Sequence, residues 1–90
     1  MLYAAVDLGG SSGRVTVGQL SGDKIVLTEM HRFKHEPVQN SDGLFWDWQF
    51  IIEQVKAGLL AATKLGEVVS VGVDSWAVDY GLINAAGEVI

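Results

Sequence analysis

The stretch DLGGSSGR, from Asp7 to Arg14, combines residue types that can hold a phosphate group. Glycines leave backbone N–H groups unobstructed, and such groups can converge on an anion. Ser11 and Ser12 add hydroxyl donors, and Arg14 adds a fork-shaped cation that is always charged. Asp7 stands at the end of an apolar run, where a carboxylate beside a phosphate loop can hold a hydrated Mg²⁺. The stretch therefore predicts a phosphate-binding loop with a metal ligand next to it.

The same stretch also suits an ordinary wide hairpin. Gly9, Gly10 and Gly13 offer three positions at which a positive φ has no steric cost. The pattern is neither a P-loop, since GK[ST] is missing, nor a dinucleotide fingerprint, since no strand–GxGxxG–helix context surrounds it. On these residues alone, the hairpin and the phosphate loop are both open interpretations.

A second carboxylate follows another apolar run. Asp74 ends the segment VVSVGVD, as Asp7 ends the first apolar run of the chain. If the two segments are parallel neighbours in a sheet, both acids face the carboxyl edge, where α/β proteins bind ligands. The alternative is that Asp74 only opens a turn. Asp79 lies in an alternating pattern and is expected to be solvated.

The hydropathy pattern predicts the elements that would position these residues, in the order β-β-β-α-β-β. Short turns join the first three strands into an antiparallel meander. A right-handed crossover through the helix would bring the next strand parallel to the first. The first strand and the strand after the helix are expected to be buried on both faces. The predicted strands are Leu2–Leu8, Arg14–Leu20, Lys24–Phe33, Val68–Trp76 and Val78–Ile83.

The helix is predicted over Trp48–Leu65, because apolar residues recur there with helical spacing. Asp47 is its expected N-terminal cap and Gly66 its expected C-terminal cap. Lys34–Leu44, which holds the only proline, is expected to be a loop. Asn84–Gly87 is expected to be a hairpin turn.

Length and composition limit the classes of function. Ninety residues fit at most one small domain, and the chain stops within what looks like a returning strand, so we expect a fragment of a longer protein. Six basic and eleven acidic residues give a net charge of −5, which argues against nucleic-acid binding. No apolar run reaches the length of a membrane span. The absence of cysteine rules out disulfides and is compatible with the cytoplasm, where we expect the protein to act.

Three segments together resemble the amino-terminal end of the FGGY carbohydrate kinases. They are AAVDLGGSSGRV from Ala4, HRFKHEPVQNSDGLFWDW from His31, and VGVDSWAVDYGLI from Val71. Members of this family have two domains of the actin-like, ribonuclease-H-like fold, with ATP in the cleft between them. The resemblance implies that residues 1–90 are the amino-terminal part of the first domain, an α/β half-domain with a mixed sheet.

The last two segments point to the branch of the family that phosphorylates L-rhamnulose to L-rhamnulose 1-phosphate. The resemblance implies ATP and Mg²⁺ as cofactors, with Asp7 placing the metal. It implies ATP-phosphate contacts from Gly10, Ser11, Ser12, Gly13 and Arg14. It also implies a sugar site lined by Asp74, Trp76 and Ala77. Ala77 stands where that branch often has glycine, and its methyl group could narrow the sugar pocket.

The family's catalytic aspartate lies far downstream, so the resemblance assigns no catalytic base to these 90 residues. We therefore expect this chain alone to be inactive as a kinase. The alternatives are a family member that acts on another ketose or polyol, such as L-fuculose, xylulose or glycerol, and a non-catalytic actin-like interaction module. The expected partners are a sugar and ATP, without nucleic acid or membrane, and the sequence does not decide the oligomeric state.

The aromatic residues and histidines have less specific interpretations. Trp46, Trp48 and Phe50 lie near the predicted helix start, and we expect them to be core residues or residues of a hydrophobic staple at the helix start. Trp76, two residues after Asp74, could either contact the sugar or pack. His31 is expected to be a hydrogen-bonded residue of the sheet.

Overall fold

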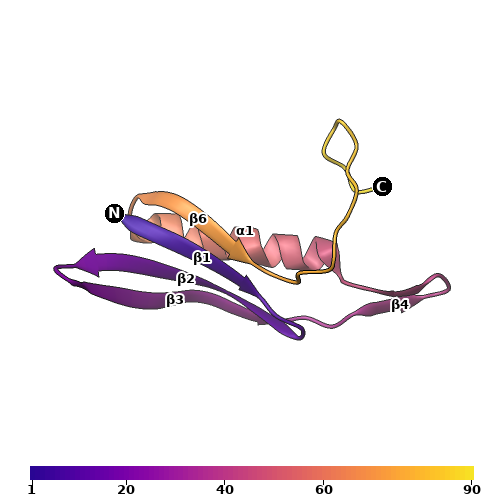
Figure 1. The fold of residues 1–90 in the computed structure, drawn as a ribbon, viewed down its shortest axis with the longest axis horizontal. Coiled ribbons are helices and arrows are strands. Elements are labelled where there is room, and N and C mark those ends of the chain that lie inside the picture. The colour runs from indigo at the N-terminus through magenta and orange to yellow at the C-terminus, as the bar shows by residue number, and fades with distance from the viewer.

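The computed structural model describes residues 1–90 and contains a four-stranded mixed sheet with one long helix on one face (Figure 1). In the sheet, the strand order is β3-β2-β1-β6. β1, β2 and β3 form the predicted antiparallel meander, and β6 runs parallel to β1. The α/β class and the mixed sheet are therefore confirmed. The four strands are β1 (Leu2–Leu8), β2 (Ser12–Ser21), β3 (Lys24–Lys34) and β6 (Val68–Asp74).

Helix α1 (Trp48–Leu65) has the predicted bounds, and Asp47 caps it by accepting a hydrogen bond from the Phe50 N–H at 3.4 Å. Its apolar stripe packs on β1, β2 and β3, where Ile51 and Ala62 are completely buried. Gly58 lets the helix approach closely, because a Cβ there would fall within 3 Å of Val15. The buried residues of the sheet are Leu2, Ala4, Val6 and Leu8 of β1, Val15 and Val17 of β2, and Phe33 of β3.

The opposite face of the sheet is open, so the expectation that β1 is buried on both faces is wrong for this structure. Burial alternates along β1, and Tyr3 and Ala5 are exposed. β6 is also not a buried strand. It forms an edge of the sheet, and Val71 and Val73 stay exposed because α1 lies over the other three strands. A single helix can cover only part of one face, which explains both differences.

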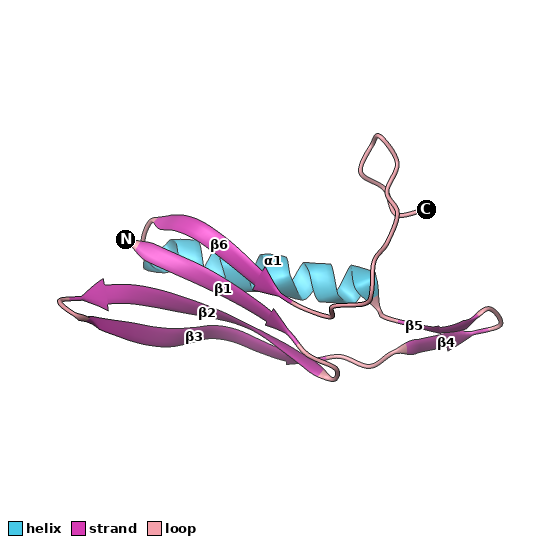
Figure 2. Cartoon of the chain, in the orientation of Figure 1, coloured by secondary structure: helices cyan, strands magenta, loops and turns pink.

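Two other predictions are wrong. The expected loop at Lys34–Leu44 contains a small hairpin of β4 (Val38–Asn40) and β5 (Gly43–Phe45), drawn in Figure 2 beyond one end of the main sheet. The strand expected at Val78–Ile83 does not form, because this segment leaves the sheet and finds no neighbouring strand (Figure 1). The turn at Asn84–Gly87 is present, closed by one bridge between Ile83 and Val89. The element order is therefore β-β-β-β-β-α-β.

Gly66 follows the helix, as predicted, but its φ of 165° is extended backbone rather than a left-handed cap. No helix of the structure has the length and apolar content needed to cross a membrane.

Candidate active site

Four charged side chains form a row across the sheet at the carboxyl ends of β1 and β6. Asp74 pairs in register with Asp7, Asp7 with Arg14, and Arg14 with Arg32. Register partners share one face of a sheet. The neighbouring residues Val6 and Val15 are buried under α1, so the row lies on the open face. The predicted meeting of Asp7 and Asp74 at one edge is thus confirmed, on the same face.

Asp7 and Arg14 are joined by an ion pair. The Arg14 Nε donates to Asp7 Oδ2 at 3.1 Å, and the two side chains are 43% and 46% exposed. A pair this exposed contributes at most about 1 kcal/mol to folding. Its main effect is to hold both side chains over the open face, while the two terminal nitrogens of Arg14 have no partner in the chain. Asp74 also has no hydrogen-bond or ion-pair partner, so its carboxylate is free to bind a ligand.

The glycine-rich stretch forms the β1–β2 turn, which closes where the Gly9 N–H donates to the Ser12 carbonyl at 2.8 Å. None of the glycines in this turn has a positive φ. The interpretation that they allow a positive φ in a hairpin is therefore wrong. Gly13 is needed for packing, because a Cβ there would collide with the ring of Phe33. A Cβ on Gly10 would meet nothing within 4 Å. The fold therefore does not require glycine at position 10, and the space beside it is open to a ligand.

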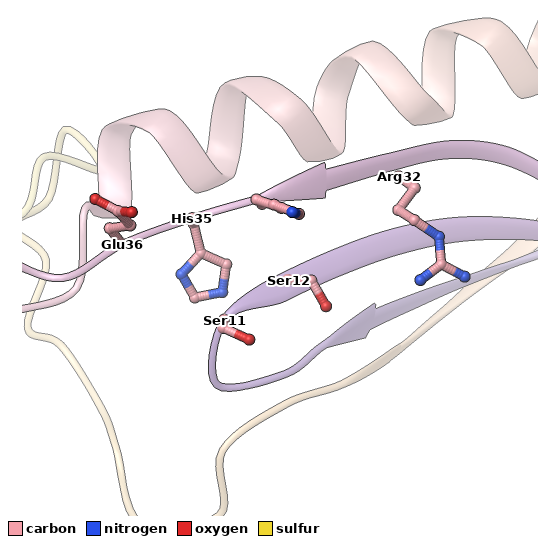
Figure 3. A pocket seen from close by; sticks show the side chains of 6 residues that line it. Ser11, Ser12, Arg32, His35 and Glu36 are labelled. Carbon is pink, nitrogen blue, oxygen red and sulfur yellow. The ribbon is translucent and has the colours of Figure 1, made fainter.

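An open hollow of about 420 Å³ lies beside this turn. Figure 3 shows the side chains of Ser11 and Ser12 at the turn and Arg32 farther along the neighbouring strand. Lys34, opposite Ser12 in register, also lines the hollow and has no ion-pair partner, whereas Arg32 is paired with Glu29. Sequence reasoning missed Arg32 and Lys34. Their signal was available, because the predicted meander places alternate residues of the third strand beside Ser12 and Arg14.

The base of the turn is held by two side chains from other parts of the chain. The carbonyl oxygen of Gly9 accepts a hydrogen bond from His35 Nε2 at 2.9 Å and another from Trp76 Nε1 at 3.2 Å. The His35 backbone N–H also donates to the Ser11 carbonyl at 3.0 Å. No pattern in the sequence connects His35 or Trp76 with the glycine turn, since both contacts join segments that are far apart in the chain.

Aromatic rings surround this attachment. Trp76 stacks on Trp46, with ring centroids 4.2 Å apart and planes at 12°, and His35 meets both rings edge to face. Asp79, which was expected to be solvated, accepts a hydrogen bond from Trp46 Nε1 at 2.9 Å. The expectation of core packing is confirmed for Trp46 and Phe50, which pack against the core cluster. Trp48 is not a core residue, because it is 45% exposed.

The residues predicted for the sugar site lie at the end of β6 and just beyond it. Asp74 ends the strand on the open face, and Ala77 is exposed in the segment that follows. Trp76 lines a second, mainly apolar hollow of about 470 Å³ that Asp74 and Ala77 do not line. His31 has the predicted role, since its Nε2 forms a hydrogen bond of 2.7 Å with Gln54 Oε1 of the helix.

No family model matches the chain. Individual proteins do match it. The rhamnulokinase of Bacillus subtilis (strain 168) is 40% identical over 89 residues, and that of Ligilactobacillus salivarius is 44% identical over 89 residues. These alignments cover 98% and 96% of this chain. The resemblance to rhamnulokinases is confirmed. The rhamnulokinase of Mannheimia succiniciproducens is a further relative, 41% identical over 90 residues.

The chain spans only 18–19% of the length of these relatives.

Proposed function

We propose that residues 1–90 form the amino-terminal part of the first domain of a two-domain, ribonuclease-H-like sugar kinase of the FGGY family. The complete kinase transfers the terminal phosphoryl group of ATP to the primary hydroxyl of L-rhamnulose, in the cytoplasm. The observation that carries the proposal is the register pairing of Asp7 with Asp74 beside the glycine–serine turn. Similarity to rhamnulokinases along nearly the whole chain supports the choice of sugar.

In this proposal the turn binds the phosphates of ATP. The backbone of Gly10 and Gly13 approaches the phosphates closely, and the hydroxyls of Ser11 and Ser12 donate to them. Arg14 reaches them with its two terminal nitrogens, because only its Nε is engaged by Asp7. Hydrogen bonds to charged groups are among the stronger ones, so these contacts can both bind and orient the nucleotide. Phosphoryl transfer depends mainly on such positioning and on charge stabilisation.

The residues present fit a magnesium ion. Mg²⁺ is held by one or two carboxylates together with substrate phosphates, and it keeps most of its water ligands. Asp7 has one carboxylate oxygen outside the ion pair with Arg14, and Asp74 has both oxygens free. Asp7 is the proposed ligand. When bound, the ion would neutralise charge that builds up on the transferred phosphate.

The proposed sugar contacts come from Asp74, Trp76 and Ala77, in the segment that leaves the sheet at its carboxyl edge. The free carboxylate of Asp74 can accept hydrogen bonds from sugar hydroxyls. We assign no catalytic base within residues 1–90 and place it in the remainder of the complete kinase. The site described here would bind and orient both substrates, and the remainder would activate the hydroxyl.

One observation favours a second candidate function. Val71 and Val73 form an exposed apolar strip on β6, which a non-catalytic actin-like module could use to bind another protein. A kinase of another ketose or polyol is the alternative within the enzyme class, since the methyl group of Ala77 can change the shape of the sugar pocket.

The test is to compare the rates of ATP-dependent phosphorylation of L-rhamnulose, L-fuculose, xylulose and glycerol by the complete protein. The proposal predicts the highest kcat/KM for L-rhamnulose. A higher kcat/KM for one of the other three compounds would show that the protein is a kinase of that compound. ATP binding without phosphorylation of any of them would favour the interaction module.

A further inference from the structure

The Gly9 carbonyl is the point at which the phosphate turn is fixed to the rest of the molecule. A carbonyl oxygen has two lone pairs, and here His35 and Trp76 occupy both. Since a carbonyl can only accept, the hydrogen of the His35 ring lies on Nε2. His35 is only 4% exposed, so its ring cannot move to water without opening the core around it. The orientation of the carbonyl is therefore determined from two sides.

This determines the direction of the next N–H. The Gly9–Gly10 peptide bond is trans, like every peptide bond of the chain. In a trans peptide the C=O and the N–H point in opposite directions within one plane. Because the Gly9 C=O points inward to His35 and Trp76, the Gly10 N–H points outward from the protein. No acceptor in the chain takes a hydrogen bond from this N–H.

We propose that His35 and Trp76 are positioning residues that aim the Gly10 N–H at a phosphate of the nucleotide. This inference rests on the proposed kinase function and adds the device that orders its phosphate loop. A donor fixed before the ligand arrives loses little conformational freedom on binding, so it binds an anion more strongly than a mobile one. The open space around Gly10 lets the phosphate come close.

Trp76 also links the two halves of the site. It lies two residues beyond Asp74, in the segment proposed for sugar binding, and its indole N–H bonds to the turn proposed for ATP binding. Stacking on Trp46, whose own N–H is held by Asp79, fixes the orientation of the indole ring. The sugar segment and the phosphate turn are thereby one connected unit.

The experiment replaces Trp76 with phenylalanine in the full-length kinase that carries these residues. Trp76→Phe keeps an aromatic ring that can stack on Trp46, and it removes the indole N–H together with part of the ring system. We expect the KM for ATP and the Kd for ADP, measured by calorimetry without sugar, to rise about three- to tenfold, as for the loss of one hydrogen bond. The KM for L-rhamnulose should change less than about twofold, because an aromatic ring remains for the proposed sugar contact of Trp76. If the indole N–H serves the sugar and not the phosphate turn, the KM for L-rhamnulose would rise and the Kd for ADP would not, and the inference would be wrong.

His35 supplies the matched control. The side-chain amide of His35→Gln can donate to the same carbonyl, whereas His35→Leu fills the space without a donor. We expect His35→Gln to bind ADP within about twofold of the wild type, and His35→Leu to bind it about three- to tenfold more weakly. Equal Kd values for ADP in all these variants, with only a lowered Tm, would show a purely structural role and overturn the proposal. A wild-type kinase that phosphorylates no sugar would instead refute the proposed function, and ADP binding by the variants would still test the positioning.

Discussion

Asp7 and Asp74, sixty-seven positions apart in the chain, are register partners on the adjacent parallel strands β1 and β6. Neighbouring strands lie about 4.8 Å apart, so two carboxylates meet at the carboxyl edge of the sheet. Arg14 neutralises one of them and leaves the other unpaired. In the proposed kinase site, this arrangement supplies a carboxylate for a cation next to the turn that would bind the phosphates.

The first prediction concerns Arg14. Arg14→Ala should weaken ATP binding by the complete protein by about 1.5–3 kcal/mol, the range for hydrogen bonds to charged groups. Its effect on the free energy of unfolding should be no more than about 1 kcal/mol, because the pair with Asp7 is half exposed. Calorimetric titration with ATP and urea denaturation measure the two quantities. Unchanged ATP affinity would support the non-catalytic module.

The second prediction separates two glycines of the turn. Gly13→Ala should destabilise the protein by about 1–3 kcal/mol, because the added methyl group collides with Phe33 in the core. Gly10→Ala should leave the free energy of unfolding within about 0.5 kcal/mol of the wild type, since its methyl group meets only open space.

ATP binding should respond differently at Gly10. The methyl group would stand where the phosphate approaches, so Gly10→Ala should raise the KM for ATP despite normal stability. Urea denaturation and the ATP dependence of the rate give both values for each variant. A Gly10→Ala protein with normal stability and a normal KM for ATP would contradict the assignment of this turn to phosphate.

The third prediction concerns Asp7 as the metal ligand. Asp7→Asn should lower kcat by roughly 100-fold, the scale for losing one preorganised electrostatic contact. It should also shift the Mg²⁺ dependence of the rate to higher concentration. Asp74→Asn is the matched variant, and there the larger change should be in the KM for the sugar. If the Mg²⁺ dependence shifts only with Asp74→Asn, the two roles must be exchanged.

The elements that carry the site were largely predictable from the sequence. The spacing of apolar residues identified the first three strands and the helix, and the crossover rule placed the strand of Asp74 beside that of Asp7. These features depend on local pattern and on a strong topological preference. The Asp47 cap was predictable for the same reason.

The attachment of the turn was not predictable, because it joins residues far apart in the chain. His35 lies 26 residues and Trp76 lies 67 residues from Gly9, and neither residue type signals a carbonyl partner. The strand expected at Val78–Ile83 had a suitable pattern but no neighbouring strand to pair with. The prediction that β6 is buried was also wrong, because burial depends on what covers the sheet and not on the strand's own residues.

The fourth prediction concerns residues 1–90 by themselves. We expect this chain to show no ATP-dependent phosphorylation of L-rhamnulose, because no catalytic base is assigned within it and phosphoryl transfer needs groups on both sides of the phosphate. A coupled assay of ADP release in the presence of L-rhamnulose measures it. Sugar-dependent turnover by the 90 residues would show that the base lies within them.

The most direct test of the kinase proposal is the product formed from ATP and L-rhamnulose by the complete protein. Phosphorus NMR of the reaction follows the transfer and identifies the oxygen that receives the phosphate. The proposal predicts one new phosphomonoester, on the primary hydroxyl of L-rhamnulose, formed as ATP is converted to ADP. ATP that remains intact with L-rhamnulose and with the other ketoses and polyols, in a protein that still binds ATP, would contradict it.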